Sequence, residues 1–269
     1  MSDIVPELEA ILSETFANLC MTDSKLKRLQ RTMTAEGASL YAARLGELAG
    51  KAIQSTLTED VLPDGRLYYN IVERLVMPMM ERNFGTITEQ SAIVQQVLDE
   101  ADGIGIKPIA PKFNAERFEN IIGAASSDQL TYAEGIKFLG EPIVNASQCI
   151  YDDFIDENAR FRQNAGLKCT IIRIPESGCC EWCRDMSGSF EYGTEPKDIY
   201  RRHDRCRCTV TFKSEKYSQN VWTRRTWTGE DKIAERETVG RELVGRLTSA
   251  ERRARRIELN ERVRSGQGR

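Results

Sequence analysis

The sequence predicts an α+β fold that is predominantly helical, with a long helical N-terminal region, a small α/β domain and a basic helical C-terminal tail. Three observations carry this prediction. Apolar residues recur at helical spacing over about the first 165 residues. Two short runs rich in β-branched residues, KCTIIRIP and CTVTFK, follow after Gly166. Helix signals return beyond Trp227, now with many arginines.

An N-terminal helical region is expected over residues 1–102. A second helix in it is expected over 34–58, ending before the turn signal PDG at 63–65. The helical pattern then resumes with a kink or break near Pro78, after which Thr88 would cap a further helix. The first helix has one apolar face, formed by Ile4, Leu8, Ile11, Leu12, Phe16 and Leu19.

A boundary is expected at DGIGIKPIAPK, whose glycines and prolines favour a linker. Residues 103–165 then form a further helical region that continues into the motif domain. In it, Asn114 caps one helix and Pro142 interrupts the next. The small α/β domain is placed at 166–213. The basic helical tail is placed at 214–269, where the segment TSAE matches a capping box.

The composition is that of an ordinary folded protein made inside a cell. Hydrophobic residues make up 40% of the chain and charged residues 29%, which argues against disorder. No apolar run approaches the roughly 20 residues that span a bilayer, so we expect no membrane contact. The N-terminus, MSDIVPELEAIL, lacks the basic start and small-residue cleavage site of a secretory signal. We therefore expect reduced thiols, and clustered cysteines in that setting favour metal binding over disulfides.

The net charge of -3 hides a division into an acidic and a basic part. Residues up to Glu195 carry about -12 and those from Pro196 onward about +9. The tail segment ERRARRIELNERVRSGQGR is rich in arginine, which suggests contact with nucleic acid or an acidic protein surface. The alternative is a solvated amphipathic helix whose arginines pair with the interleaved Glu251, Glu258 and Glu261.

The segment GCCEWCRDMSGSFEYGTEPKDIYRRHDRCRCTVTF holds most of the metal-ligand chemistry of the chain. It contains five of the eight cysteines and the single histidine. Cys180 and Cys183 have C-x2-C spacing, and about twenty residues later His203, Cys206 and Cys208 form H-x2-C-x-C. Zinc prefers four tetrahedral ligands of thiolate sulfur and imidazole nitrogen, and two pairs from one loop are a common way to supply them. This spacing predicts a zinc-stapled domain.

Six side chains compete for four positions around the ion. Cys206 and Cys208 compete for one of them, because alternate residues of a strand point to opposite faces. Cys208 could instead be buried as a small hydrophobe. Cys179 is expected to lie outside the site, being too close to Cys180 for joint chelation. The metal ligands that we expect are Cys180, Cys183 and His203, together with Cys206 or Cys208.

Three other interpretations of this segment stay open. The cysteines could be reduced core residues beside an unliganded histidine. His203 could activate Cys183 or Cys206 as a nucleophile, although nothing in the sequence supplies the third, orienting group. A catalytic zinc would need a bound water and a general base, for which Glu181 is the nearest candidate. We expect a structural metal and no enzymatic activity.

The segment resembles the Mu F-like head-morphogenesis (minor capsid) family of tailed bacteriophages. That family shows a C-x2-C pair, a following glycine, and a closing histidine or asparagine with CRC near the end of a small C-terminal domain. Asp204 stands where family members often have proline. The similarity covers about forty residues, and the helical region before the motif agrees with it. The matching residues are Cys180, Cys183, Gly188, His203, Cys206, Arg207 and Cys208.

The resemblance implies a minor structural protein of the phage head, present in few copies. Its partners would be the portal protein and the major capsid protein or neighbouring copies of itself, with packaged DNA contacted through the basic tail. It would reside in the virion, at the capsid interior and portal vertex, after assembly in the host cytoplasm. An alternative function is a nucleic-acid-binding zinc module with a basic helical tail. An appended enzyme, as some relatives carry, is not expected, because the residues after Phe212 have no catalytic constellation.

Overall fold

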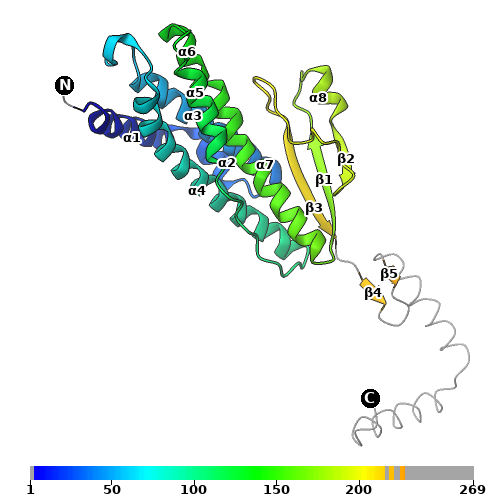
Figure 1. Ribbon diagram of the computed structural model, residues 1–269. Coiled ribbons are helices and arrows are strands. Elements are labelled where there is room, and N and C mark those ends of the chain that lie inside the picture. The colour runs from blue at the N-terminus through cyan, green and yellow to red at the C-terminus, as the bar shows by residue number, and fades with distance from the viewer. Residues whose placement is uncertain (1–2, 216–217, 221–224, 228–269) are drawn as a thin grey trace, which may run out of the picture. The chain divides into compact units, whose positions relative to one another are not determined.

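The computed structural model describes residues 3–215, 218–220 and 225–227 (Figure 1). Most of the predicted tail at 214–269 therefore lies outside the described residues, including its capping box and its arginine-rich end. The helical character and the charge contacts of that tail stay predictions of the sequence.

The chain divides into two units, residues 1–215 and 216–269, which are described separately. In the second unit the described residues form a two-stranded antiparallel ladder, in which β4 (Ser218–Asn220) pairs with β5 (Arg225–Trp227). The first unit contains the described helices and a three-stranded sheet, and it includes residues 178–212, which we call the cysteine–histidine segment. The divisions that the sequence suggests within this unit stay predictions about folding units.

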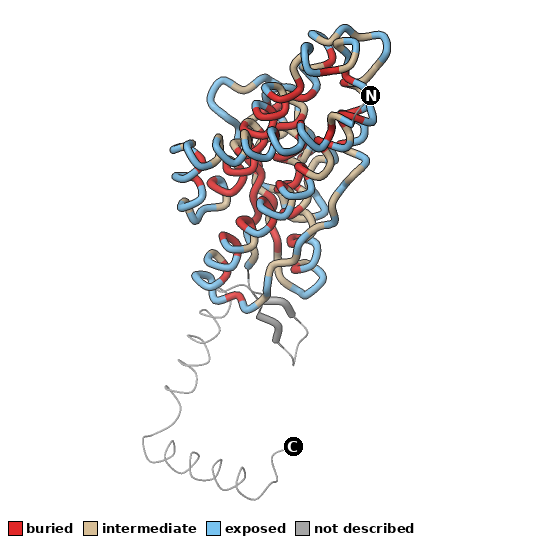
Figure 2. Tube along the Cα trace, turned by 90° about the vertical axis from the view of Figure 1, so that its left-hand side faces the viewer, coloured by how far each residue is buried: buried red, intermediate tan, exposed pale blue. Residues whose placement is uncertain are grey.

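The first unit is mostly helical, which confirms the predicted α+β class with a predominance of helix. A short 3-10 turn at Pro63–Gly65 occupies the predicted turn. The helices are α1 (Val5–Thr22), α2 (Ser24–Arg31), α3 (Ala35–Thr56), α4 (Tyr69–Ala101), α5 (Ala115–Ala125), α6 (Tyr132–Phe138), α7 (Glu141–Asn164) and α8 (Glu181–Asp185). The outer long helices, such as α1 and α4, bury one face and expose the other (Figure 2), whereas α3 is covered on nearly all sides between Gly37 and Gly50.

Two helix boundaries lie where the sequence predicts them. The Asn114 side chain accepts a hydrogen bond from the Arg117 backbone N–H at 3.2 Å and so caps α5. Pro142 lies in the first turn of α7, where a missing N–H costs nothing, and the helical path is interrupted between α6 and α7. The predicted interruption at Pro142 is confirmed.

Of the kink or break predicted near Pro78, the break is wrong, because α4 continues through this residue. Thr88 is not a cap either; it lies inside α4, and its hydroxyl donates to the Phe84 carbonyl at 2.7 Å. Proline inside a helix costs about 3 kcal/mol. Val76 and Met80, on either side of Pro78, are fully buried, and burial of such side chains along both halves of α4 outweighs that cost.

The sheet of the first unit is antiparallel with the strand order β2-β1-β3. It consists of β1 (Lys168–Ile174), β2 (Gly188–Glu191) and β3 (Thr209–Glu215). The two β-rich runs that the sequence shows after Gly166 correspond to β1 and β3. In the central strand, Ile171 lies opposite Phe190 on one side and Phe212 on the other.

The main core lies between the helices and continues onto one face of the sheet. At its centre α3 and α7 approach closely, because α3 presents small residues such as Ala42 and Ala49, which are fully buried. A Cβ atom at Gly46 would lie 2.7 Å from Ser147 Oγ and 2.9 Å from Val144 Cα, so only glycine fits at this contact.

The sheet and α8 lie on one side of the helical layer (Figure 1). β1 and β3 both contact α7, and β3 also contacts α3. The segment between β2 and β3 contains neither helix nor strand, and it runs back past α7. Within the described residues, no helix is long and apolar enough to cross a membrane.

Candidate metal centre

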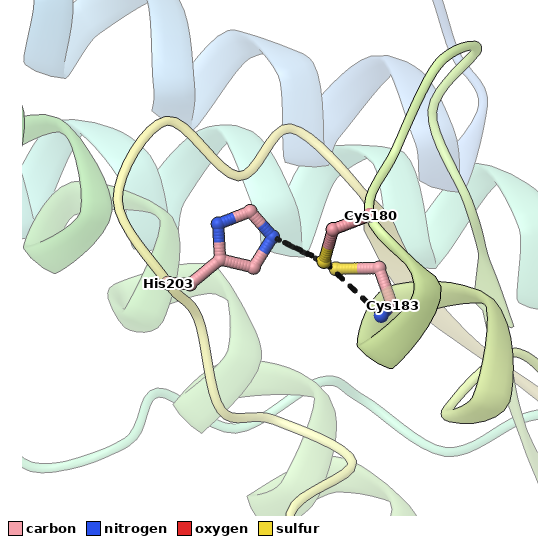
Figure 3. Close-up of side chains that lie close together, drawn as sticks. All are labelled: Cys180, Cys183 and His203. Atoms are coloured by element: carbon pink, nitrogen blue, oxygen red, sulfur yellow. Dashed lines mark hydrogen bonds between the residues drawn. The ribbon is translucent and has the colours of Figure 1, made fainter.

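The C-x2-C pair is fixed by the first turn of α8. Cys180 is the N-cap residue of this helix, and its sulfur accepts a hydrogen bond from the Cys183 backbone N–H at 3.4 Å. This capping contact places both sulfurs on the same side of the turn (Figure 3). Cys183 is fully buried, whereas Cys180 is exposed.

His203 comes from the segment between β2 and β3 and faces this pair (Figure 3). Its Nε2 atom lies 3.3 Å from Cys180 Sγ and 3.1 Å from Cys183 Sγ. Its Nδ1 atom lies 2.6 Å from the Asp204 carbonyl oxygen. A carbonyl oxygen only accepts, so Nδ1 carries the hydrogen and the Nε2 lone pair points at the two sulfurs. This tautomer is the one that a metal-binding imidazole requires.

A second group of ligand atoms shares Cys183 with the first. The ligand atoms of Cys183, Cys206 and Cys208 lie within 4.8 Å of one another, as do those of Cys180, Cys183 and His203. The Cys183 and Cys206 sulfurs are 3.8 Å apart. The structure therefore places the five predicted ligands in two groups that share Cys183, and the ligand atoms of each group lie near enough to bind a metal ion. The sixth candidate, Cys179, belongs to neither group.

Strand alternation, which the sequence suggested as the basis for choosing between Cys206 and Cys208, does not apply to these residues. Neither residue lies in a strand, because β3 begins at Thr209. Strand alternation therefore does not separate them: both are buried, and both sulfurs approach Cys183. The Cys208 sulfur also accepts a hydrogen bond from the Glu176 backbone N–H at 3.5 Å.

The sulfurs lie in an environment that favours negative charge at one of them. A hydrogen bond from Cys208 lowers the pKa of the Cys206 thiol well below its ordinary value, and the nearby Arg202 guanidinium acts in the same direction, against the effect of burial. Burial raises the pKa of Cys183. Neighbouring groups and burial therefore act in opposite directions on the pKa of the Cys206 thiol, whereas burial dominates at Cys183.

Two arginines attach the cysteine–histidine segment to the helical layer. Arg202 forms a two-pronged ion pair with Asp152 of α7 at 2.6 and 2.7 Å, with both side chains almost completely buried. It also donates to the Cys208 carbonyl at 2.6 Å. Burial opposes the charge on Arg202, but the Asp152 carboxylate outweighs burial and raises the pKa of Arg202 above its ordinary value.

Arg207, which stands between the last two cysteines, makes the second attachment. It pairs with Glu141 of α7 at 2.6 Å and with Glu47 of α3 at 3.3 Å. Sequence reasoning counted Arg202 only in the charge balance, and it placed Arg207 in the CRC match without a partner. Nothing in the local pattern identifies their partners, because these lie 50 to 160 residues away in the chain.

The donor set and its geometry fit a metal ion that prefers sulfur and nitrogen ligands. Thiols and an imidazole converge from two ends of one segment, and the histidine tautomer leaves its free lone pair toward them. The other ring nitrogen of His203 binds a backbone carbonyl and not a carboxylate. Sites rich in cysteine sulfur are typical of closed structural metal centres, and the carbonyl contact fixes the orientation of the imidazole.

Comparisons of the chain with protein-family models, with curated proteins and with solved structures found no match. The resemblance to the phage head-morphogenesis family therefore depends on the motif residues alone.

Proposed function

We propose that the chain is a non-enzymatic structural protein in which one zinc ion fastens the cysteine–histidine segment. The observation that carries this proposal is the orientation of His203, whose free Nε2 lone pair faces the two sulfurs of the C-x2-C turn. A tetrahedral zinc thiolate with Zn–S bonds of about 2.3 Å has sulfurs about 3.8 Å apart. The Cys183–Cys206 separation of 3.8 Å has this value. We therefore assign the ligands as Cys180, Cys183, His203 and Cys206.

A structural role suits the segment that the ion would hold. The residues between β2 and β3 form no regular secondary structure, so little backbone hydrogen bonding fixes them. The buried sulfur cluster joins Cys206 and Cys208 from this stretch to Cys183 of α8, and it is separate from the main core. A metal ion that ties both ends of such a segment contributes directly to folding.

Metal content tests the proposal, with a neighbouring cysteine as the matched control. The purified full chain should contain one zinc per molecule by elemental analysis. Cys180→Ser should lose that zinc, whereas Cys179→Ser, one position away and outside both ligand groups, should keep it. A wild-type chain that binds no zinc, or equal zinc content in the two variants, would contradict the metal centre.

Cobalt substitution tests the assignment of the fourth ligand. Cobalt(II) bound by three thiolates gives a sulfur-to-metal absorption whose intensity follows the number of sulfurs. Cys206→Ser should lower this absorption by about one third, and Cys208→Ser should leave it unchanged. The opposite pattern would assign the fourth position to Cys208.

For the biological role we propose a minor structural protein of a tailed-phage head, associated with the portal and the capsid interior. The support is the motif CEWCRDMSGSFEY…HDRCRCTVTF after a helical body. The arginine of its CRC element has a structural task here, because Arg207 joins the motif to Glu47 and Glu141 of the helical layer.

Co-expression with the portal protein, followed by imaging of assembled particles, tests this role. The chain should co-purify with the portal protein and give density at the portal vertex. Particles that assemble with this chain absent from the vertex and the capsid interior would overturn the proposal. A portal gene immediately upstream in the genome would agree with it.

The alternative is a nucleic-acid-binding zinc module, and the charge of about +9 from Pro196 onward favours it. Duplex DNA binding by the full chain should then weaken steeply as salt rises, because phosphate contacts release counterions. A chain that ends at Trp227 should lose this binding. Binding that does not depend on salt, or no binding, would exclude the alternative.

A further inference from the structure

Arg173 occupies a position on β1 where the strand pattern calls for an apolar residue. Side chains of a strand alternate between faces, and Cys169 and Ile171 on the same face as Arg173 are fully buried. Arg173 is itself only 1% exposed, which makes it one of the largest fully buried side chains among the described residues. A charged group at such a position needs compensating partners.

The partners of Arg173 lie in the cysteine–histidine segment, which includes α8. Nη2 donates to the Cys183 sulfur at 3.7 Å and to the Cys206 sulfur at 3.8 Å. Nη1 donates to the backbone carbonyls of Ile199 and, at 3.0 Å, Arg201. The guanidinium carbon lies 5.3 Å from the centre of the Trp182 ring, within the range of a cation–π contact.

Arg173 differs from the other deeply buried arginines in having no carboxylate partner. Arg162 pairs with Asp99, and Arg202 pairs with Asp152. Over the residues that the structure describes, no carboxylate oxygen lies within ion-pair distance of Arg173. A buried guanidinium is costly unless negative charge faces it. The groups in contact with it that can carry that charge are the two sulfurs.

We propose that Arg173 is the counter-cation and positioning residue of the metal centre. This inference rests on the proposed zinc site. Three thiolates and a neutral imidazole around a divalent ion leave one net negative charge, and a single guanidinium neutralises it. Nη2 contacts the two buried sulfurs that are 3.8 Å apart, so it also holds them at the separation that tetrahedral zinc requires.

Zinc affinity, measured by competition with a chromophoric chelator, tests this role. Arg173→Met keeps the length of the side chain and removes its charge, and zinc should bind about 10- to 100-fold more weakly, as for loss of other groups that support metal ligands. Arg173→Lys should recover part of the affinity. The control is Arg117→Met, which removes a guanidinium that pairs with Asp153 and not with sulfur; its zinc affinity should equal that of the wild type.

A second measurement separates charge compensation from simple packing. In the zinc-loaded chain, Arg173→Met should lower the thermal unfolding midpoint. In the chelator-treated chain the same substitution removes a buried cation with no carboxylate partner, so the midpoint should stay equal or rise. An equal fall with and without zinc would show a packing role and overturn the inference.

The outcomes also separate this inference from the proposed function. A wild-type chain that binds no zinc contradicts both. A wild-type chain that binds one zinc, with Arg173→Met binding it equally tightly, contradicts only the role of Arg173. In the expected case zinc affinity falls from the wild type to Arg173→Lys and falls further in Arg173→Met.

Discussion

The contact between α3 and α7 and the cysteine–histidine segment are held together by different physical means. Between the helices, small side chains let the backbones approach, and fully buried apolar residues such as Ala49 and Ile143 fill the contact. In the segment, sulfurs, arginines and backbone carbonyls make the contacts, and its buried cluster is separate from the main core. Apolar burial is non-directional, whereas ion pairs and metal bonds depend on each partner.

The two regions therefore differ in how much stability is lost when a single chemical group is removed. Loss of one partner from a buried ion pair leaves an uncompensated charge and costs more than the pair itself contributes. Loss of a methyl group from a large apolar core is shared among many contacts. The effects of substitutions on the free energy of unfolding should therefore differ between the two regions in size and in sign. They should also differ in their response to chelation and pH.

The largest effect should come from the ion pair that anchors the segment to α7. Asp152→Ala leaves Arg202 buried without a carboxylate and should lower the free energy of unfolding by about 3–5 kcal/mol. The neighbouring Asp153 pairs with Arg117 and is about one third exposed, so Asp153→Ala should cost at most about 1 kcal/mol. Chemical denaturation of both variants measures the difference. Equal losses would mean that burial of the pair is unimportant.

Replacing glycines of the helical layer by alanine should change the free energy of unfolding by smaller amounts, and the direction should differ between two positions. Gly46→Ala pushes a methyl group against α7 and should destabilise the chain by about 1–3 kcal/mol. Gly85 is exposed in α4, and a Cβ added there would meet no neighbouring atom within 4 Å. Gly85→Ala should therefore stabilise the chain by up to about 1 kcal/mol. Both changes should be the same with and without a chelator. A shift of the Gly46→Ala value on chelation would show that the α3–α7 contact depends on the metal.

The smallest effect should appear as a pH dependence at the start of α2. Asp23 caps α2 and pairs with Arg44 at 2.5 Å, and this guanidinium lowers the pKa of Asp23 from its ordinary 3.8 to about 2. A lowered pKa stabilises the fold above the unfolded value, and the contribution is lost as the pH falls from about 4 to about 2.

Asp23→Asn keeps a good capping residue and removes the charge. At pH 7 the variant should be less stable by at most about 1 kcal/mol, and this difference should disappear near pH 2. Denaturation curves of wild type and variant across this pH range measure it. A difference that stays constant down to pH 2 would rule out the ion pair as its source.

Features that depend on local pattern were predictable from the sequence. The helical class follows from apolar periodicity, the start of α5 follows from Asn114, and the interruption before α7 follows from Pro142. Each of these depends on residues within one or two turns. The C-x2-C and histidine groups also come together as their spacing predicts.

Features that depend on distant partners were not predictable in this way. Pro78 remains inside α4 because tertiary burial outweighs its local preference. The role of Arg173 depends on sulfurs 10 and 33 residues away. Arg207 depends on Glu47, which is 160 residues away. The net charge of a segment includes such arginines, but it does not indicate which side chains each of them contacts.

The five predicted ligand residues differ in burial, so reagents in solution reach them unequally. Cys183, Cys206 and Cys208 are almost completely covered, whereas Cys180 and His203 face solvent. An arriving ion or an alkylating reagent therefore meets Cys180 first. Chemical modification of Cys180 should accordingly precede modification of the three buried thiols.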